Sequence, residues 1–224
     1  MNECRFKVKN YWDEHELYIT DEYGFKQLSI EESMKRIKNK LFEKGYKKIL
    51  DLGCGSGSHS IYFNKNGFDV YASDIDCRKV RENIKRLNIT DINVVEYSFT
   101  CIPYGNEFFD AVICTSTIHH AILDDIKKGI SEIYRVLKPN GYFIFDIVSD
   151  EDKSYGLGTK IEENTFVGSR EGEENIPHHY TNEKELKLLL NAFSSAEINK
   201  SIYSFYDLKG NKYSSKDFDV AAIK

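Results

Sequence analysis

The chain of 224 residues lacks any run of about 18 consecutive apolar residues, the length that a membrane-spanning helix needs. Its opening stretch, MNECRFKVKNYWDEHE, also lacks the apolar segment of a secretory signal. We therefore expect no membrane as a partner.

Cysteine occurs in a pattern that excludes two further classes of protein. The five cysteines are odd in number and none forms a C-x-x-C pair; they are Cys4, Cys54, Cys77, Cys101 and Cys114. A disulfide framework needs paired cysteines, and a zinc knuckle needs closely spaced ones. The pattern is typical of a protein kept in a reducing compartment, so we expect a cytoplasmic location.

An excess of positive charge is absent as well. The chain has 31 Lys and Arg against 36 Asp and Glu, which gives a net charge of −5. The lysine-rich stretches MKRIKNK and RKVRENIKR read as solvated helix faces. This balance argues against a groove for a nucleic acid and favours a small-molecule partner. The residues do not distinguish a monomer from a homodimer.

What the sequence does contain is an alternation of short apolar segments and longer amphipathic ones. The apolar segments predict strands at 47–53, 68–73, 92–98, 109–116 and 142–148, and the amphipathic segments predict helices at 29–45, 58–67, 76–88, 122–141 and 182–193. We expect the helix at 122–141 to stop at Pro139 and Gly141. Such alternation is typical of βαβ units in a parallel sheet. Two further strands around DLKGNK predict an antiparallel hairpin that completes the sheet.

Two segments stand outside this alternation. Residues 149–180 are polar and contain glycine, so we expect an irregular insertion that forms a lid or another functional loop. Residues 1–45 are expected to form a helical lid or cap ahead of a domain at 46–224. The aromatic residues of the cap segment either pack one helix onto the domain or close over a substrate and exclude water; they include Tyr11, Trp12 and Tyr18.

The segment ILDLGCGSGSHS, residues 49–60, places Gly53, Gly55 and Gly57 directly behind a predicted strand. A plain turn between a strand and a helix needs one glycine rather than three. Glycines at this spacing indicate that the backbone turns sharply and that a ligand lies against it. In an open α/β sheet, ligands bind beyond the carboxyl ends of the strands, which is where this segment lies.

Two carboxylates narrow the choice of ligand. A dinucleotide fingerprint would carry its third glycine at the position of Ser58, and a pyrophosphate would be disfavoured beside Asp51. Asp74, at the end of the second predicted strand, is placed to accept hydrogen bonds from a ribose diol. This acidic rim suits a cofactor with an amino group and a sulfonium better than a diphosphate.

With these features in place, the stretch from about Tyr46 to Val148 resembles the class I S-adenosylmethionine-dependent methyltransferases, of the small UbiE-like or methyltransferase-11-like subgroup. LDLGCGSG is similar to their first motif, IPYGNEFFDAVICTSTIHH to their LPF…FDvV segment, and EIYRVLKPNGYFIF to their RvLkpGG segment. The resemblance implies a Rossmann-like three-layer α/β sandwich. Its sheet would have seven mostly parallel strands, with the last one antiparallel. It also implies S-adenosyl-L-methionine as methyl donor and S-adenosyl-L-homocysteine as product.

The resemblance also implies a set of cofactor-binding residues. Four residues of the loop after the first predicted strand, which we call the glycine loop, would lie against the amino-acid part of the cofactor: Gly53, Cys54, Gly55 and Gly57. The remaining members would hold its amino group, ribose and adenine: Asp51, Asp74, Ile75, Ser98, Phe99 and Thr115. Many relatives hold the adenine amine with an aspartate where this chain has Ser98. A serine accepts this hydrogen bond more weakly, and the backbone amide of Phe99 is a candidate helper.

Four histidines occur in two adjacent pairs. His119 and His120 follow the fourth predicted strand and are candidate general bases, although capping and packing roles explain them equally well. His178 and His179 belong to the insertion and, with Tyr180, are expected to line the substrate mouth. We expect no metal, because neighbouring residues usually point apart and no cysteine or carboxylate completes a known ligand spacing.

The favoured function is therefore methyl transfer from S-adenosylmethionine to a small molecule. A tRNA-modifying methyltransferase is an alternative, because STIHH also resembles wobble-uridine enzymes, although the acidic charge argues against it. A non-catalytic module that binds the same cofactor would have the same fold. A nicotinamide oxidoreductase is disfavoured by Ser58 and Asp51.

Overall fold

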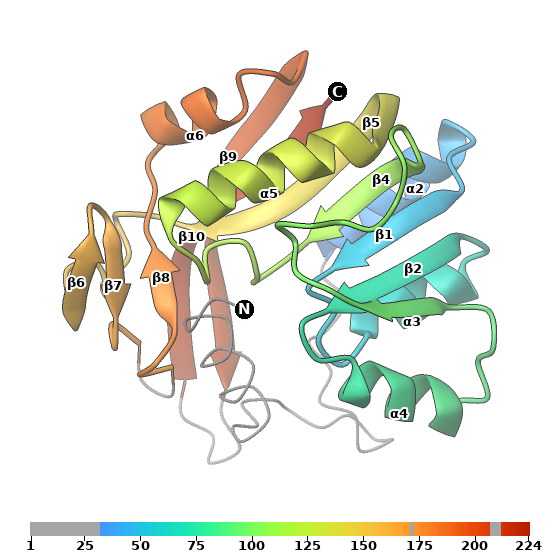
Figure 1. The fold of residues 1–224 in the computed structure, drawn as a ribbon, viewed down its shortest axis with the longest axis horizontal. Helices are drawn as coiled ribbons and strands as arrows, with labels where there is room; N and C mark the ends of the chain where they lie inside the picture. The colour runs from blue at the N-terminus through green and yellow to red at the C-terminus, as the bar shows by residue number, and fades with distance from the viewer. Residues whose placement is uncertain (1–31, 171–172, 207–211) are drawn as a thin grey trace.

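The computed structural model describes residues 32–170, 173–206 and 212–224 (Figure 1). In chain order the elements are α2 (Glu32–Glu43), β1 (Lys48–Leu52), α3 (Ser58–Lys65), β2 (Asp69–Asp74), α4 (Arg78–Arg86), β3 (Asn93–Glu96), β4 (Phe109–Cys114), α5 (Leu123–Val136), β5 (Leu137–Val148), β6 (Thr159–Glu162), β7 (Thr165–Val167), β8 (Pro177–His179), α6 (Glu183–Leu189), β9 (Ser195–Tyr206) and β10 (Lys212–Ile223). Strands and helices alternate through β5, as the sequence predicts.

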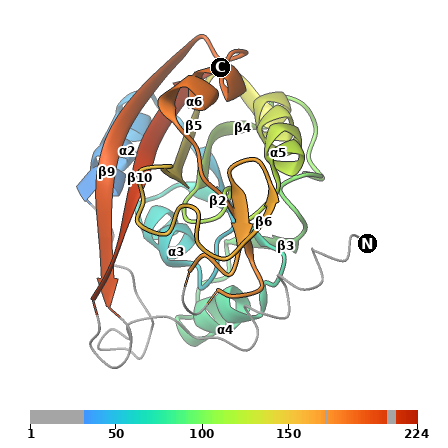
Figure 2. The same ribbon diagram turned by 90° about the vertical axis from the view of Figure 1, so that its left-hand side faces the viewer.

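The main sheet has seven strands in the order β3-β2-β1-β4-β5-β10-β9. The first five strands of this order pair in parallel, whereas β10 is antiparallel to both β5 and β9. Figure 2 shows β9 and β10 running together along one side of the molecule. The predicted sheet, with its last strand antiparallel, is confirmed. The strand order reverses between β1 and β4, so the ends of these two strands mark the edge where ligands of such sheets bind.

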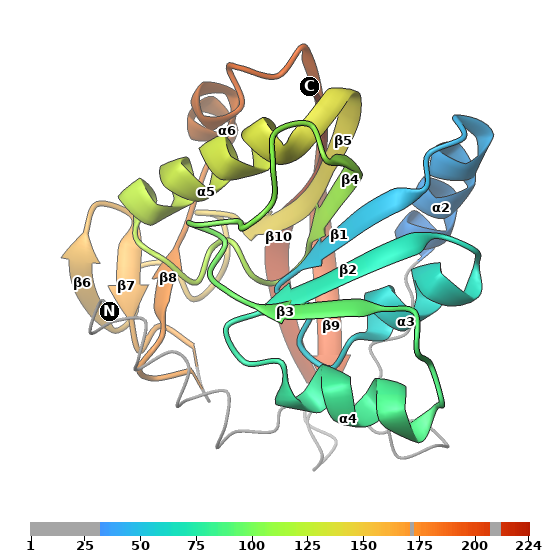
Figure 3. The same cartoon turned by 45° about the vertical axis from the view of Figure 1, so that its right-hand side comes forward.

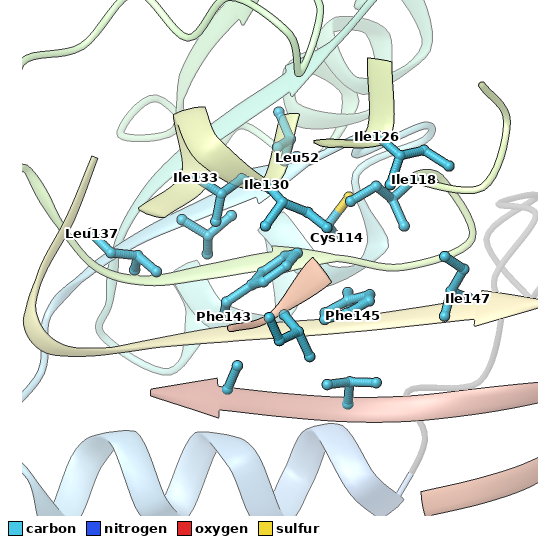
Figure 4. Close-up of a cluster of buried hydrophobic side chains, with 14 of the residues drawn as sticks. Leu52, Cys114, Ile118, Ile126, Ile130, Ile133, Leu137, Phe143, Phe145 and Ile147 are labelled. Atoms are coloured by element: carbon cyan, nitrogen blue, oxygen red, sulfur yellow. The ribbon is translucent and has the colours of Figure 1, made fainter. Parts of the chain in front are cut away.

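The helices cover the sheet on two faces, as Figures 1 and 3 show. On one face, α5 and α6 pack Ile130, Ile133 and Leu186 against the sheet. The cluster around α5 is drawn in Figure 4, with Phe143 and Phe145 of β5 stacked at a centroid distance of 4.2 Å. On the other face, α2, α3 and α4 contribute a separate cluster. Strand residues alternate between the two clusters because successive side chains of a strand point to opposite faces.

The segment at 122–141 departs from the prediction, because α5 ends at Val136 and β5 begins at Leu137. The strand pairs Leu137 with Phe109 and resumes at Tyr142 with Ala111, so a bulge holds the residues between them. Pro139 has no N–H to donate, and Asn140 has a φ of 65°. The helix therefore stops before the proline.

The insertion at 149–180 also departs from the prediction, because it is not irregular throughout. It contains a second, antiparallel sheet of three short strands in the order β6-β7-β8. Phe166 and Tyr180 pack there against Val148, at the end of β5. Strands of three or four residues leave no periodic pattern in a sequence, which is why the prediction was wrong. In the described part of the chain, no helix has the length and apolar character to cross a membrane.

Candidate functional site

The glycine loop follows β1, and its backbone is tied to β2. The amides of Gly53 and Cys54 both donate to the Ser73 carbonyl oxygen, at 2.7 and 2.9 Å. Gly53, Gly55 and Gly57 have φ values of 78°, 52° and 87°, a region that side chains with a Cβ rarely occupy. The sharp turn that the sequence predicts is present.

The three glycines have different surroundings, which the sequence could not reveal. A Cβ atom on Gly53 would lie 2.1 Å from Thr117 Oγ1, and one on Gly57 would lie 2.6 Å from Cγ2 of Val80 in α4. A Cβ atom on Gly55 would meet no atom of the described residues within 4 Å. Two of the glycines therefore allow close packing of the protein on itself. Of the three, only Gly55 faces space that the described part of the chain leaves open for a ligand.

Asp74 joins the glycine loop to the end of β2. Its Oδ2 accepts the Gly55 amide at 2.8 Å, and its Oδ1 accepts the Ile75 amide at 2.7 Å. Burial raises the pKa of this carboxyl from 3.8 to about 6, against the lowering effect of these amides and with a smaller raising effect from Asp76. A carboxylate oxygen has room for more than one hydrogen bond, so Asp74 can still accept hydroxyl donors.

Asp51 lies beneath the same loop and is almost fully buried, with 2% of its surface exposed. Its Oδ2 accepts the Ser60 hydroxyl at 2.5 Å. Burial raises its pKa, while the nearby His59 and the Ser60 hydrogen bond lower it. The His59 ring also lies against the end of β4, because its Nδ1 is 3.2 Å from Thr115 Oγ1. Asp51, Ser60, His59 and Thr115 thus form a polar cluster that links the glycine loop, the start of α3 and the end of β4.

Two of the expected adenine-binding residues, Ser98 and Phe99, contact neighbouring parts of the protein. The Ser98 hydroxyl oxygen accepts the Thr100 amide at 3.2 Å and lies 3.0 Å from Thr100 Oγ1. The Phe99 ring packs so closely on α5 that a Cβ atom on Gly129 would lie 2.3 Å from it. The adenine roles of Ile75, Ser98 and Phe99 stay predictions.

The first histidine pair does not point apart, contrary to the reasoning from sequence. His119 and His120 lie in a turn after β4, where the His120 amide donates to the Thr117 carbonyl oxygen at 3.0 Å. Their ring centroids are 4.2 Å apart. Successive side chains alternate in a strand but can share one side of a turn, so the rule about neighbours fails here.

His178 of β8 joins this pair. Its ring centroid is 4.9 Å from that of His120 and 5.9 Å from that of His119. Its Nε2 lies 2.8 Å from Glu173 Oε2, and its Nδ1 lies 3.1 Å from the Ile176 carbonyl oxygen. We refer to His119, His120 and His178 as the histidine cluster.

The charge state of the cluster follows from burial. Burial and the neighbouring cationic groups lower the pKa of His119 well below its usual value, and burial above all lowers that of His120 to about 3. Burial raises the pKa of Glu173, but the hydrogen bond to His178 and the interactions with His120, His178 and Arg170 lower it to about 2. A general base works best with a pKa near the working pH, so these values count against proton storage on His119 or His120. Their catalytic role stays a prediction.

His179 and Tyr180 are fully buried and have complete sets of partners. His179 lies 2.8 Å from Thr165 Oγ1 through Nδ1 and 2.9 Å from Glu185 Oε2 through Nε2, which ties the small sheet to α6. The Tyr180 hydroxyl donates to Ser154 or Ser169, at 2.7 and 2.9 Å. These contacts argue for a structural function, and their place at a substrate mouth stays a prediction. The other expected mouth residues lie outside the described part of the chain: Tyr11, Trp12 and Tyr18.

Reasoning from the sequence missed three residues of this site: His59, Thr117 and Glu173. His59 stands only two positions after Gly57, so its place at the start of α3 could have been inferred. Thr117 makes the close contact with Gly53, and Glu173 meets His178 across an irregular stretch. No spacing rule predicts either of these contacts.

Comparison with known proteins finds similarity to methyltransferases. A family model described as a methyltransferase domain matches residues 50–145. The chain is 28% identical over 158 residues to a putative methyltransferase of Bacillus subtilis (strain 168), which covers 69% of this chain and 62% of that protein. It is 31% identical over 113 residues to a tRNA (carboxymethyluridine(34)-5-O)-methyltransferase of Arabidopsis thaliana, which covers 50% of this chain and 26% of that protein. The chain thus spans less than two thirds of the length of either relative.

A solved structure shows the same fold. It is the crystal structure of Burkholderia thailandensis 1,6-didemethyltoxoflavin-N1-methyltransferase with bound 1,6-didemethyltoxoflavin and S-adenosylhomocysteine. The TM-score is 0.59 at 19% identity, over 87% of this chain and 79% of that one. The resemblance and the fold class that the sequence predicts are confirmed.

Proposed function

We propose that this chain transfers a methyl group from S-adenosylmethionine to a small-molecule acceptor, because residues 50–145 match a family model described as a methyltransferase domain and the fold is that of a solved methyltransferase. The observation that carries the proposal is the 2.8 Å hydrogen bond from the Gly55 amide to Asp74. It joins the glycine loop and the acid of β2 at the edge where ligands of open α/β sheets bind.

The residues at this edge fit the chemistry of the cofactor. The open space at Gly55 accepts a carbon chain without a clash, which a side chain there would prevent. Asp74 is an acceptor for the two ribose hydroxyls, and Asp51 sets a negative potential beneath the loop for the amino group. Both carboxylates suit a cationic sulfonium cofactor and oppose a pyrophosphate.

The cofactor, when bound, supplies an electrophilic methyl group. The task of this chain's own residues is to hold the donor at the glycine loop, to orient the acceptor in line with it and to exclude water. Positioning of this kind needs no strict catalytic side chain. We place the reaction in the cytoplasm, which agrees with the free thiols of the described cysteines Cys54, Cys77, Cys101 and Cys114.

Calorimetry with S-adenosylhomocysteine tests the proposal. We expect micromolar binding by the wild-type chain, and Asp74→Ala should weaken it by about 1.5–3 kcal/mol, or roughly 10- to 150-fold, the usual loss for a hydrogen bond to a charged group. Asp69→Ala is the matched control, since it removes an exposed carboxylate at the opposite end of the same strand. Heat with NAD and none with S-adenosylhomocysteine would refute the assignment.

A transfer assay separates the remaining alternatives. Methyl-labelled cofactor is incubated with the protein and with separate small-molecule and tRNA fractions of a cell extract. We expect label in the small-molecule fraction. Label in tRNA alone would favour the tRNA-modifying alternative, and binding without any transfer would favour a non-catalytic module.

A further inference from the structure

The histidine cluster lies at the same sheet edge as the glycine loop but serves none of the cofactor contacts proposed above. One nitrogen from each of its three imidazoles lies within 4.8 Å of the other two. Two of the rings come from the turn after β4 and the third comes from β8, so the cluster forms only when the small sheet docks on the main one. The Thr117 side chain, between the turn and Gly53, connects the two sites.

We propose that the histidine cluster, with Glu173 beside it, binds one zinc ion. Three imidazoles and a carboxylate form a donor set typical of zinc and of related divalent transition metals. Calcium and magnesium prefer oxygen ligands, so the three nitrogens disfavour them. The proposal replaces the expectation of no metal, whose premise about neighbouring histidines the geometry contradicts.

The orientation of His178 is the first observation in support. Its Nδ1 faces the Ile176 carbonyl oxygen at 3.1 Å, and because a carbonyl only accepts, this nitrogen carries the hydrogen. Nε2 is therefore the nitrogen that faces Glu173 Oε2 at 2.8 Å and the rest of the cluster. A histidine ligand commonly donates its other N–H to a backbone carbonyl in this way, which fixes the tautomer and the ring. Without a metal, a proton between Nε2 and the carboxylate must hold this contact.

The second observation is His119 Nδ1, which is buried and has no hydrogen-bond partner among the residues that the structure describes. The residue is 95% buried, since its exposed fraction is 5%, and buried polar atoms are nearly always paired. An unpaired ring nitrogen beside two other imidazoles can donate its lone pair to a metal ion.

The charges around the histidine cluster and the distances between its ligand atoms are compatible with a bound zinc ion. Glu173 supplies the negative charge, and its Oε1 lies 4.0 Å from His120 Nε2. The Arg170 guanidinium opposes a cation, but it is held by Ser215 at 2.7 Å and lies 3.8 Å from Asp152. Two ligand nitrogen atoms on one tetrahedral zinc ion lie about 3.4 Å apart, because each Zn–N distance is about 2.1 Å. Modest ring rotations therefore close the cluster around an ion.

Metal titration of the full chain tests the proposal without reference to methyl transfer. The protein is stripped with a chelator and titrated with ZnCl₂ by calorimetry, and with CoCl₂ by visible absorption. We expect one equivalent of zinc to bind, and cobalt to produce the d–d bands of a tetrahedral site. Zinc should also raise the melting temperature, because only the folded chain assembles the cluster.

Variants locate the ion. Glu173→Gln keeps the side-chain volume, His120→Asn replaces the imidazole with a smaller polar group, and each should weaken zinc binding by at least about tenfold. His59→Gln removes a histidine outside the cluster and should leave the zinc affinity unchanged. Circular dichroism of each variant confirms the fold. Absence of zinc binding by folded wild-type protein, or unchanged affinity in both cluster variants, would overturn the proposal.

Discussion

The glycine loop permits a prediction that separates packing from ligand binding at neighbouring positions. Gly55→Ala and Gly57→Ala each add one methyl group, at sites two residues apart. Both positions have positive φ, which costs a residue with a Cβ about 1–2 kcal/mol. At Gly57 the new Cβ also lies 2.6 Å from Val80 Cγ2, and overpacking of this kind typically adds about 1–3 kcal/mol.

We therefore expect Gly57→Ala to lower the free energy of unfolding by about 2–5 kcal/mol, and Gly55→Ala to lower it by about 1–2 kcal/mol. Binding should show the opposite order. The methyl group at Gly55 projects into the space assigned to the ligand, so this variant should lose most of its affinity for S-adenosylhomocysteine. Folded Gly57→Ala protein should retain more of it.

Guanidinium unfolding curves and calorimetry on the same preparations measure the two effects. If Gly57→Ala is as stable as wild type, the contact with α4 does not constrain the loop. If Gly55→Ala binds the ligand with wild-type affinity, the open space at this glycine is not the ligand site. Either result would refute the division of roles between the two glycines.

Two further predictions concern ionisation and the small sheet. The pKa of Asp74 is raised from 3.8 to about 6, so the unliganded protein should lose stability as pH rises from about 4 to 6. The shift sets an upper limit of about 3 kcal/mol, and the loss should be smaller because the side chain is partly exposed. S-Adenosylhomocysteine affinity should instead fall as pH drops through about 6, and Asp74→Asn should flatten both profiles; a wild-type slope in that variant would assign the titration to another group. Tyr180→Phe removes the hydroxyl that contacts Ser154 and Ser169, so it should destabilise the fold by about 1–3 kcal/mol and leave the methyl-transfer rate near wild type. A large loss of rate with unchanged stability would restore Tyr180 to the substrate mouth.

Much of the fold could be predicted because its signals are local. The alternation of strands and helices reflects periods of two and 3.6 residues, which are visible in any short window. The placement of Asp51 and Asp74 near the ends of β1 and β2 follows from the same windows, since Asp51 is the last residue but one of β1 and Asp74 is the last residue of β2. The bulge at Pro139 was missed because the start of β5 is decided by its pairing with β4, a strand that is distant in the sequence.

The sequence by itself determined the order of the elements, the sharp turn at the glycines and the acids that flank it. Each depends on bonded neighbours and on the backbone freedom of single residues. Only the tertiary structure decided that Gly53 and Gly57 face protein while Gly55 faces open space, because Thr117 and Val80 reach the loop from other elements. It likewise decided that three histidines meet, since His178 comes to His120 from 58 positions away along the chain. Contacts of this kind arise from the docking of one sheet on another, and a linear pattern does not encode them.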